Sequence, residues 1–284
     1  MSGDTNVDFY ESSPEFVRVW ADSRLTISSA LWQGCPDLDL DRAQEQKLNL
    51  MADLADFKPG GKVLDIGCGY GGLLTFAVDE RKVGHALGIT TSASQAGHVK
   101  SLGNPAVEVS DCDFWDLPVE TAGFDSVVAV QSLEHVLAGA PADCGSDPKA
   151  MREMLRRIHA WTVPGGRFAA EVCVAGPAET RDDLHEQLDA EVLRNSRQAI
   201  MPRLGDLLNA GSGLWEPVSI VTQHEDMLRT LEAAGSRLSE REQEARAIGG
   251  DRLYQATCET VRGTTAAVRG GIMRIAWISW KRID

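Results

Sequence analysis

The sequence predicts an α/β fold with a mostly parallel sheet and helices on both faces. Strand-like apolar runs alternate with helical patterns between residues 62 and 173. This alternation is typical of parallel strands joined by right-handed crossovers. A final apolar run over 272–283 follows the turn residues Gly270 and Gly271, so the chain is expected to end in a further strand.

The individual elements follow from apolar spacing, turn residues and capping residues. The expected strands of the alternating part are 62–66, 85–89, 106–109, 126–131 and 167–173. The expected helices are 39–56, one directly after Gly71, 92–101, 148–161 and 223–234, the last ending at Gly235. Asp39 or Asp41 can cap the helix 39–56, and Ser92 can cap the helix 92–101.

Composition limits the classes of function. The 284 residues carry a net charge of −14, which argues against nucleic acid as a partner because phosphate binding needs clustered Lys and Arg. No apolar run has the length of a membrane span, and residues 1–20 lack a signal-peptide core, so the protein is predicted to be cytoplasmic. The six cysteines are scattered without C-x-x-C spacing, and the histidines show no ligand spacing, so no metal site is expected.

The most informative segment is 63–72, an apolar strand that carries Asp65 and opens into Gly67, Gly69 and Gly71 before a helix. Glycines at such a turn let the backbone approach a ligand closely, and the helix start offers unpaired N–H groups. The spacing is G-x-G-x-G rather than the dinucleotide G-x-G-x-x-G. The preceding acid favours a ligand that carries an ammonium group.

Polar side chains follow the ends of the next strands, where open α/β sheets bind ligands. Thr90, Thr91 and Gln95 follow the second strand. Asp113-Phe114-Trp115-Asp116-Leu117-Pro118 follows the third strand, and Gln131-Ser132-Leu133-Glu134-His135 follows the fourth. Core packing is the alternative role for Phe114 and Trp115, and a helix-start hydrogen bond is the alternative for His135.

These motifs resemble class I S-adenosylmethionine-dependent methyltransferases. The resemblance implies a Rossmann-like fold with a seven-stranded sheet, in which 272–283 is an antiparallel C-terminal edge strand. It implies S-adenosylmethionine as cofactor, with Asp65 holding the amino group and the glycine turn against the methionine part. Thr90, Thr91 and Gln95 would serve the ribose in place of the family's usual acid. Asp113 and the Phe114 N–H would meet the adenine, and Trp115 would cover it.

The N-terminal part narrows the resemblance to the branch of cyclopropane fatty-acid and mycolic-acid synthases. The segments that carry it are Tyr10–Phe16, Leu25–Trp32 and Asp41–Leu48. In that branch Ser28 would touch the cofactor carboxylate, and Tyr10 would face the reacting methyl group. The branch holds a carbonate base with a Cys, a Glu, a His and a Tyr. Here Ser29 replaces the Cys, Glu171 replaces the His, and only Glu134 is kept, so the carbonate site is expected to be absent.

Four parts of the chain are expected. Residues 1–56 form a helical cap, 57–174 the cofactor-binding core, 175–222 a lid over the substrate, and 223–284 complete the core sheet. The expected activity is methyl transfer to a hydrophobic small molecule of secondary metabolism, at a prenyl-type alkene carbon, with Tyr10, Glu134 and His135 as catalytic candidates. His185, Trp215 and His224 are weaker candidates from the lid and its border.

Other functions stay open. The acceptor atom could be nitrogen or oxygen, and the chain could be a cyclase or a regulatory binding protein on the same fold. Glu134 could instead support the N-terminal segment, and His185 and His224 could lie on a solvated helix surface. The expected partner is a small molecule rather than nucleic acid, and the sequence allows a homo-oligomer.

Overall fold

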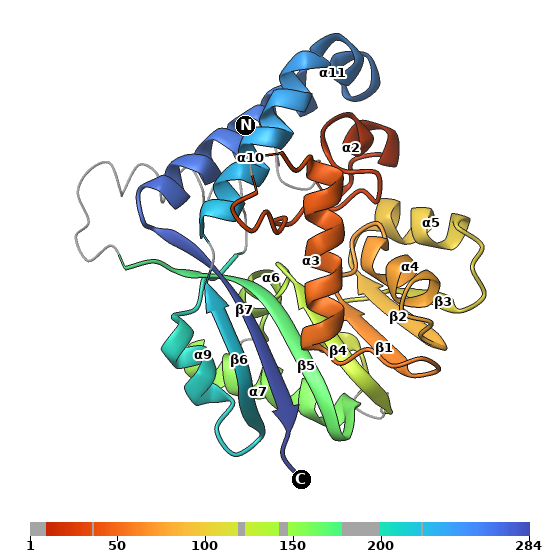
Figure 1. Ribbon diagram of the computed structural model, residues 1–284, viewed down its shortest axis with the longest axis vertical. Helices are drawn as coiled ribbons and strands as arrows, with labels where there is room; N and C mark the ends of the chain where they lie inside the picture. Colours follow the sequence, from red (N-terminus) through yellow and green to blue (C-terminus); the bar gives the residue numbers. More distant parts are fainter. Residues whose placement is uncertain (1–9, 36, 119–122, 142–146, 178–198, 223) are drawn as a thin grey trace.

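The computed structural model describes residues 10–35, 37–118, 123–141, 147–177, 199–222 and 224–284. Its centre is a seven-stranded sheet in the order β3-β2-β1-β4-β5-β7-β6 (Figure 1). The strands are β1 (Lys62–Ile66), β2 (His85–Thr90), β3 (Val107–Asp111), β4 (Phe124–Val130), β5 (Thr162–Ala175), β6 (Trp215–Thr222) and β7 (Met273–Arg282). The first five are parallel, and β7 is antiparallel to both of its neighbours. The predicted fold class is confirmed.

The sheet edge differs from the expected one. The C-terminal strand β7 is antiparallel as predicted, but it lies between β5 and β6, and β6 forms the edge. Residues 215–222 had been assigned to the lid. Pro217 lies within β6, the pairing with β7 shifts beside it, and the strand is largely exposed, so the sequence lacks the apolar alternation of a half-buried strand.

Helices cover both faces of the sheet, as predicted. They are α2 (Pro14–Trp20), α3 (Leu40–Leu54), α4 (Gly72–Asp79), α5 (Ala93–Ser101), α6 (Leu133–Ala138), α7 (Asp147–Trp161), α9 (Leu204–Ala210), α10 (His224–Glu240) and α11 (Glu242–Arg269). Val63 and Val128 pack in the core with α3 and α4, whereas Leu64 and Val127 pack with α6, α7 and α9. This division follows from the alternation of side chains along each strand.

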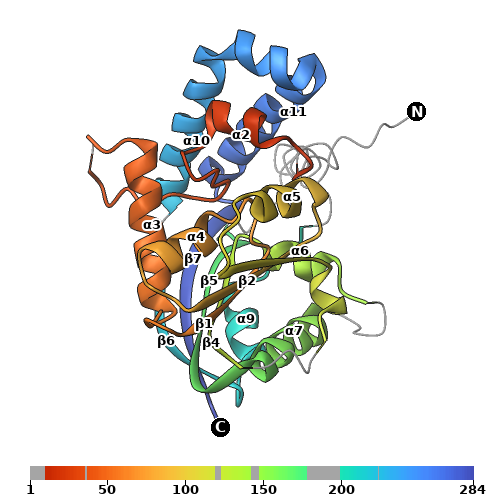
Figure 2. The same ribbon diagram turned by 90° about the vertical axis from the view of Figure 1, so that its right-hand side faces the viewer.

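Residues 224–284 contribute both to the sheet, through β7, and to a cap formed by the C-terminal helices. Helix α10 continues through Gly235 rather than ending there, and α11 runs back beside it. Figure 1 and Figure 2 show both helices with α2 beyond the carboxyl ends of the parallel strands. Phe16 and Trp20 of α2 belong to one buried cluster with Leu238 of α10 and Tyr254 of α11.

The segment after α2 is bonded to α10. The Ala30 N–H donates to Thr230 Oγ1 at 2.9 Å, across 200 residues of sequence. The Trp32 N–H donates to Asp226 at 2.9 Å, and its indole N–H donates to Thr230 at 3.0 Å. The cap therefore combines both ends of the chain. Among the residues that the structure describes, no helix has the length and apolar character needed to cross a membrane.

Candidate functional site

A cavity of about 740 Å³ lies at the carboxyl ends of β1, β2 and β4, with walls from α3, α10 and α11. Most of the predicted site residues share its wall: Tyr10, Ser28, Asp65, Gly67, Gly69, Thr90, Thr91, Gln95, Asp113, Phe114, Gln131, Glu134 and His135. These residues come from the N-terminal segment and from the ends of four strands. The topology thus brings together what the sequence analysis had assigned to one site.

The three glycines of the turn have different roles. Gly69 has φ +54°, and a Cβ there would meet nothing within 4 Å, so its backbone faces open space in the cavity. A Cβ on Gly67 would lie 2.5 Å from Ser132 Cβ. Gly71 is the N-cap of α4 and does not line the cavity, contrary to the prediction. A Cβ there would lie 2.9 Å from Val99 of α5, so Gly71 serves helix packing.

Asp65 is a buried carboxyl that lacks a matching partner among the described residues. It is 2% exposed, and its Oδ1 atom accepts no hydrogen bond within the described structure. Burial raises the pKa of Asp65 to about 7, against the opposing effect of Lys47. A buried acceptor without a donor is costly. The ammonium group of a ligand would supply the missing donor.

The end of β2 forms a hydrogen-bonded turn. The Thr90 hydroxyl donates to Gln95 Oε1 at 2.7 Å, which fixes the Gln95 amide at the cavity wall. Ser92 caps α5 as predicted, because its hydroxyl accepts from the Gln95 N–H. The same hydroxyl donates to the Tyr10 carbonyl at 2.9 Å. This turn therefore also fastens the N-terminal segment over the cavity.

The segment after β3 supplies one aromatic residue to the cavity wall, Phe114, rather than both Phe114 and Trp115. Asp113 and Phe114 line the cavity, and Asp113 also accepts a hydrogen bond from the Trp115 N–H at 2.8 Å. Trp115 does not line the cavity, so it cannot cover a bound base there. Its indole N–H donates to the Val136 carbonyl, and its ring packs edge-on against Phe114 in the core. The core-packing alternative is correct for Trp115.

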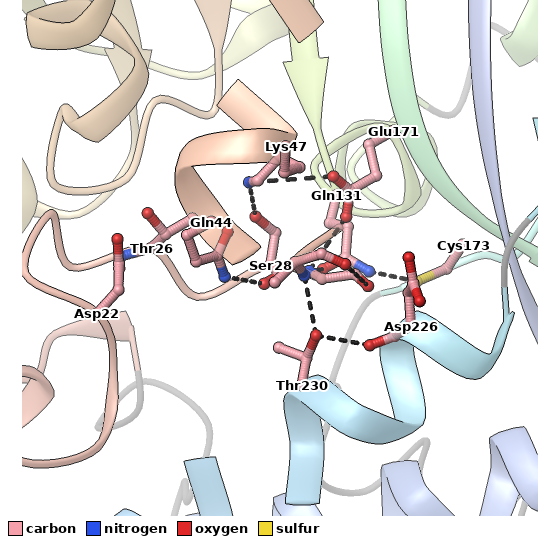
Figure 3. Close-up of polar contacts among 12 residues, drawn as sticks. Asp22, Thr26, Ser28, Gln44, Lys47, Gln131, Glu171, Cys173, Asp226 and Thr230 are labelled. Carbon is pink, nitrogen blue, oxygen red and sulfur yellow. Dashed lines mark hydrogen bonds and ion pairs between the residues drawn. The ribbon is translucent and has the colours of Figure 1, made fainter. Parts of the chain in front are cut away.

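Helix α3 contributes two buried polar residues that the sequence analysis did not assign to the site. Gln44 and Lys47 are each 1% exposed and line the cavity. The Gln44 amide donates to the Ser28 carbonyl at 2.8 Å, and Lys47 Nζ donates to Ser28 Oγ at 2.6 Å (Figure 3). Lys47 Nζ also lies 4.0 Å from Glu171 Oε2. Gln44 and Lys47 are three residues apart on an otherwise apolar helix face, and this spacing could have indicated that they are buried polar residues of the site.

The ends of β4 and β5 are joined beneath the cavity. The Ser29 N–H lies 3.1 Å from both Gln131 Oε1 and Glu171 Oε1. Gln131 also donates to Cys173 Sγ at 3.2 Å (Figure 3). Gln131 has φ +49°, which is strained for a residue with a side chain. Burial raises the pKa of Glu171, and Lys47 opposes that effect.

Glu134 is the most suggestive catalytic candidate. It is 3% exposed, its Oε1 accepts from the Cys173 N–H, and its Oε2 has no partner among the described residues. Burial raises the pKa of Glu134 to about 7, and the nearby Glu171 adds to this effect. A carboxyl with such a pKa can exchange a proton near neutral pH.

Tyr10 and His135 form a pair beside Glu134. The Tyr10 hydroxyl lies 3.0 Å from His135 Nε2, and the two rings meet edge to face with centroids 5.4 Å apart. The Tyr10 residue is 39% exposed, so it stands at the rim. Burial of its hydroxyl and the Glu134 carboxyl raise the pKa of Tyr10. The phenol therefore stays neutral at physiological pH.

The wall opposite the sheet comes from the C-terminal helices and combines apolar side chains with threonines, of which Thr230, Thr257 and Thr260 donate their hydroxyls to carbonyls of their own helix. Its members are Met227, Thr230, Leu231, Ala234, Thr257, Thr260, Val261 and Thr264. The weaker candidates do not join it. Trp215 is buried elsewhere and donates to the Leu155 carbonyl, His224 is exposed, and His185 lies outside the described residues. Within the described ranges, no three His, Cys, Asp or Glu side chains gather as a metal site would require.

Comparison with known sequences identifies relatives over the whole chain. Residues 4–278 match the family model described as mycolic acid cyclopropane synthetase. The chain is 27% identical to cyclopropane mycolic acid synthase 2 of Mycobacterium bovis, over 92% of this chain and 88% of the relative. It is 36% identical to a probable fatty acid methyltransferase of Pseudomonas putida, over 45% of this chain and 33% of the relative.

Solved structures share the fold. A cyclopropane synthase from Mycobacterium tuberculosis superposes with a TM-score of 0.84 at 20% identity, covering 98% of this chain and 97% of that one. A mycolic acid cyclopropane synthase complexed with SAH and CTAB gives the same TM-score and coverage at 19% identity. A coclaurine N-methyltransferase gives a TM-score of 0.78 at 20% identity, over 99% of this chain and 83% of that one.

Proposed function

Since the chain belongs to the mycolic acid cyclopropane synthetase family and is an S-adenosylmethionine-dependent methyltransferase, we propose that it methylates an alkene carbon of an apolar small molecule. A prenyl-type acceptor of secondary metabolism is the proposed class. The observation that carries this proposal is Glu134, a buried carboxyl in the cavity wall whose second oxygen lacks a partner among the described residues. The Tyr10–His135 pair and the wall formed by α10 and α11 line the same cavity.

The wall residues fit the cofactor, which supplies an electrophilic methyl group when bound. The unpaired acceptor of Asp65 suits the ammonium group, and Gly69 leaves space for a close backbone approach. Ser28 would meet the carboxylate, and Thr90, Thr91 and Gln95 would meet the ribose hydroxyls. Asp113 and the Phe114 N–H would meet the adenine. With the cofactor held in this way, its methyl group would face Tyr10 and Glu134.

The proposed reaction transfers one methyl group to the alkene and then removes one proton from the product. The alkene π electrons form a bond to the methyl carbon, and the bond from that carbon to sulfur breaks with its electrons staying on sulfur. The acceptor is left with a carbocation, which the neutral Tyr10 ring faces and steadies. Glu134 Oε2 then takes a proton from the adjacent carbon, and the C–H electrons restore a double bond. The wall formed by α10 and α11 would exclude water that could otherwise capture the cation.

The contacts of Glu171 support a protein carboxylate as the base. By the resemblance to the cyclopropane synthases, Glu171 would stand where a carbonate ligand does. Here it accepts a hydrogen bond from the Ser29 N–H and lies 4.0 Å from Lys47. Glu134 would accept the proton from the methylated cation, and the reaction would end without ring closure.

One observation favours a second acceptor class. The Tyr10 hydroxyl lies 3.0 Å from His135 Nε2, and this pair could accept the proton of an N–H or O–H group. Methylation at nitrogen or oxygen is therefore the alternative. A cyclase that binds the cofactor without transferring its methyl group is the other.

Product analysis distinguishes these functions. The protein is incubated with S-adenosylmethionine carrying a ¹³C methyl group and with prenylated, phenolic and amine acceptors. A new ¹³C–carbon bond is expected, and Glu134→Gln should reduce its formation by about 100-fold or more. Glu259→Gln, at an exposed position of α11, is the matched control and should retain the native rate. A methyl group on nitrogen or oxygen would show the alkene assignment to be wrong.

A further inference from the structure

Ser28 is held from one side by two residues of helix α3. The Gln44 amide donates to its carbonyl and the Lys47 ammonium donates to its hydroxyl oxygen, at 2.8 and 2.6 Å (Figure 3). Gln44 and Lys47 are almost fully buried, and α3 packs on the sheet through Leu48 and Met51. The backbone and side chain of Ser28 are therefore fixed by rigid structure.

The contact with Lys47 sets the direction of the Ser28 hydroxyl. An ammonium group can only donate, so Ser28 Oγ is the acceptor in this bond. The single hydrogen of Ser28 must then be donated elsewhere. No acceptor for it is recorded among the described residues, and Ser28 lines the cavity. The hydroxyl is thus arranged to donate to an acceptor atom of a bound ligand.

This end of the cavity has a donor part, formed by Lys47 and Ser28, beside an acceptor part, formed by Asp65. Among the described residues of the cavity wall, Lys47 is the sole Lys or Arg. It lies 4.0 Å from Glu171. Burial lowers the pKa of Lys47, and the charges of Glu171, Asp22 and Asp65 oppose this effect. Asp65 has an unpaired acceptor oxygen. A donor site beside an acceptor site matches a carboxylate and an ammonium group borne by one carbon.

We propose that Lys47 is a positioning residue: it turns the Ser28 hydroxyl toward the carboxylate of the cofactor's amino-acid part. Lys47 thereby selects nucleosides that carry an intact α-amino acid over those that lack the carboxylate. The inference rests on the cofactor placement given under the proposed function. It adds a residue of α3 to the site and assigns it to cofactor selectivity.

The test compares binding of S-adenosylmethionine with that of decarboxylated S-adenosylmethionine, by calorimetry on the full chain. The native protein should prefer S-adenosylmethionine by about 10-fold or more, the scale of a charge-assisted hydrogen bond. Lys47→Met and Ser28→Ala should each lose most of this preference. The double variant should lose no more than either single variant, because Lys47 acts through Ser28.

A second pair of variants guards against misfolding. Lys47→Met leaves the Glu171 carboxyl without its buried cation, which can destabilise the fold. Glu171→Gln and Glu171→Gln/Lys47→Met both lack this unpaired charge. The inference requires the preference for S-adenosylmethionine to be lower in the double variant than in Glu171→Gln. Retention of the preference without Lys47, or losses that add in the Ser28/Lys47 double variant, would overturn it. The acceptor plays no part in these titrations, so a wrong acceptor would show in product analysis alone.

Discussion

The hydroxyl of Tyr10 lies 3.0 Å from Nε2 of His135, although 125 residues of sequence separate them. This contact joins the N-terminal segment to the first turn of α6, directly after Glu134. It therefore sets where the N-terminal segment meets the cavity, beside the group proposed to accept a proton.

Replacing Tyr10 separates the roles of its ring and its hydroxyl. Tyr10→Phe keeps the ring and loses the bond to His135, so the turnover rate should fall by about 2- to 10-fold with an unchanged product. Tyr10→Leu also removes the ring that faces the cation, and its rate should fall further. The rates are measured at saturating S-adenosylmethionine. Equal rates in the native protein and Tyr10→Leu would contradict a role for the ring.

Glu134 predicts a pH dependence of the rate. A base must be ionised to accept a proton, and burial raises the pKa of Glu134 to about 7. The rate should therefore rise with pH between about 6 and 8 and level off above that range. Glu134→Gln should leave a low rate without this rise, and a flat native profile would exclude Glu134 as the base.

Asp65 predicts opposite pH effects on binding and on folding. Burial raises its pKa to about 7, and the ionised form binds an ammonium group, so affinity for S-adenosylhomocysteine should increase as pH rises through about 7. The folded pKa exceeds the unfolded value, so the contribution of Asp65 to the stability of the ligand-free protein is full below about pH 4 and lost as pH rises through about 7.

Calorimetry and thermal unfolding across this pH range measure both effects. Asp65→Asn should weaken S-adenosylhomocysteine binding. It should also reduce the pH dependence of the affinity and that of the free energy of unfolding. The same pH dependences in Asp65→Asn as in the native protein would assign them to other groups, such as Asp22, Glu134 and Glu171, whose pKa values burial also raises.

The turn glycines predict different losses. In Gly69→Val the side chain projects into the open cavity, so S-adenosylhomocysteine binding should fall by at least about 10-fold. The free energy of unfolding should also fall, because a φ of +54° is strained for a β-branched residue. In Gly67→Ala the new Cβ would collide with Ser132, so the free energy of unfolding itself should fall. Gly97→Ala, in exposed helix with open space at its Cβ, is the control for both. Native affinity in Gly69→Val would mean that the site is misplaced.

The elements that the sequence could predict are those fixed by local chemistry. The strand 62–66, the glycine turn and the Ser92 cap each occupy a short stretch of chain. Their residues need little help from distant parts of the structure. The shared cavity wall follows from topology, because parallel strands bring their carboxyl ends to one edge of the sheet.

The elements that the sequence could not predict depend on tertiary contacts. Strand β6 carries Pro217 and pairs on one side alone, so its apolar pattern is weak. Gly235 is typical of a helix end, yet α10 continues through it because that helix packs against α11 and α2. A lysine in a helix is usually solvated, so the sequence does not indicate that Lys47 is buried. Its burial beside Ser28 depends on a tertiary contact with Glu171 of β5.

The bonds from Ala30 to Thr230 and from Trp32 to Asp226 fix the order in which the molecule can be completed. Residues 30 and 32 are synthesised 200 and 194 residues before their partners Thr230 and Asp226. The sheet strands β1 to β5 can pair in the meantime, but the N-terminal segment must wait for α10. The contacts between the N-terminal segment and α10 therefore form only after α10 has been synthesised, and a chain that stops before α10 cannot make them.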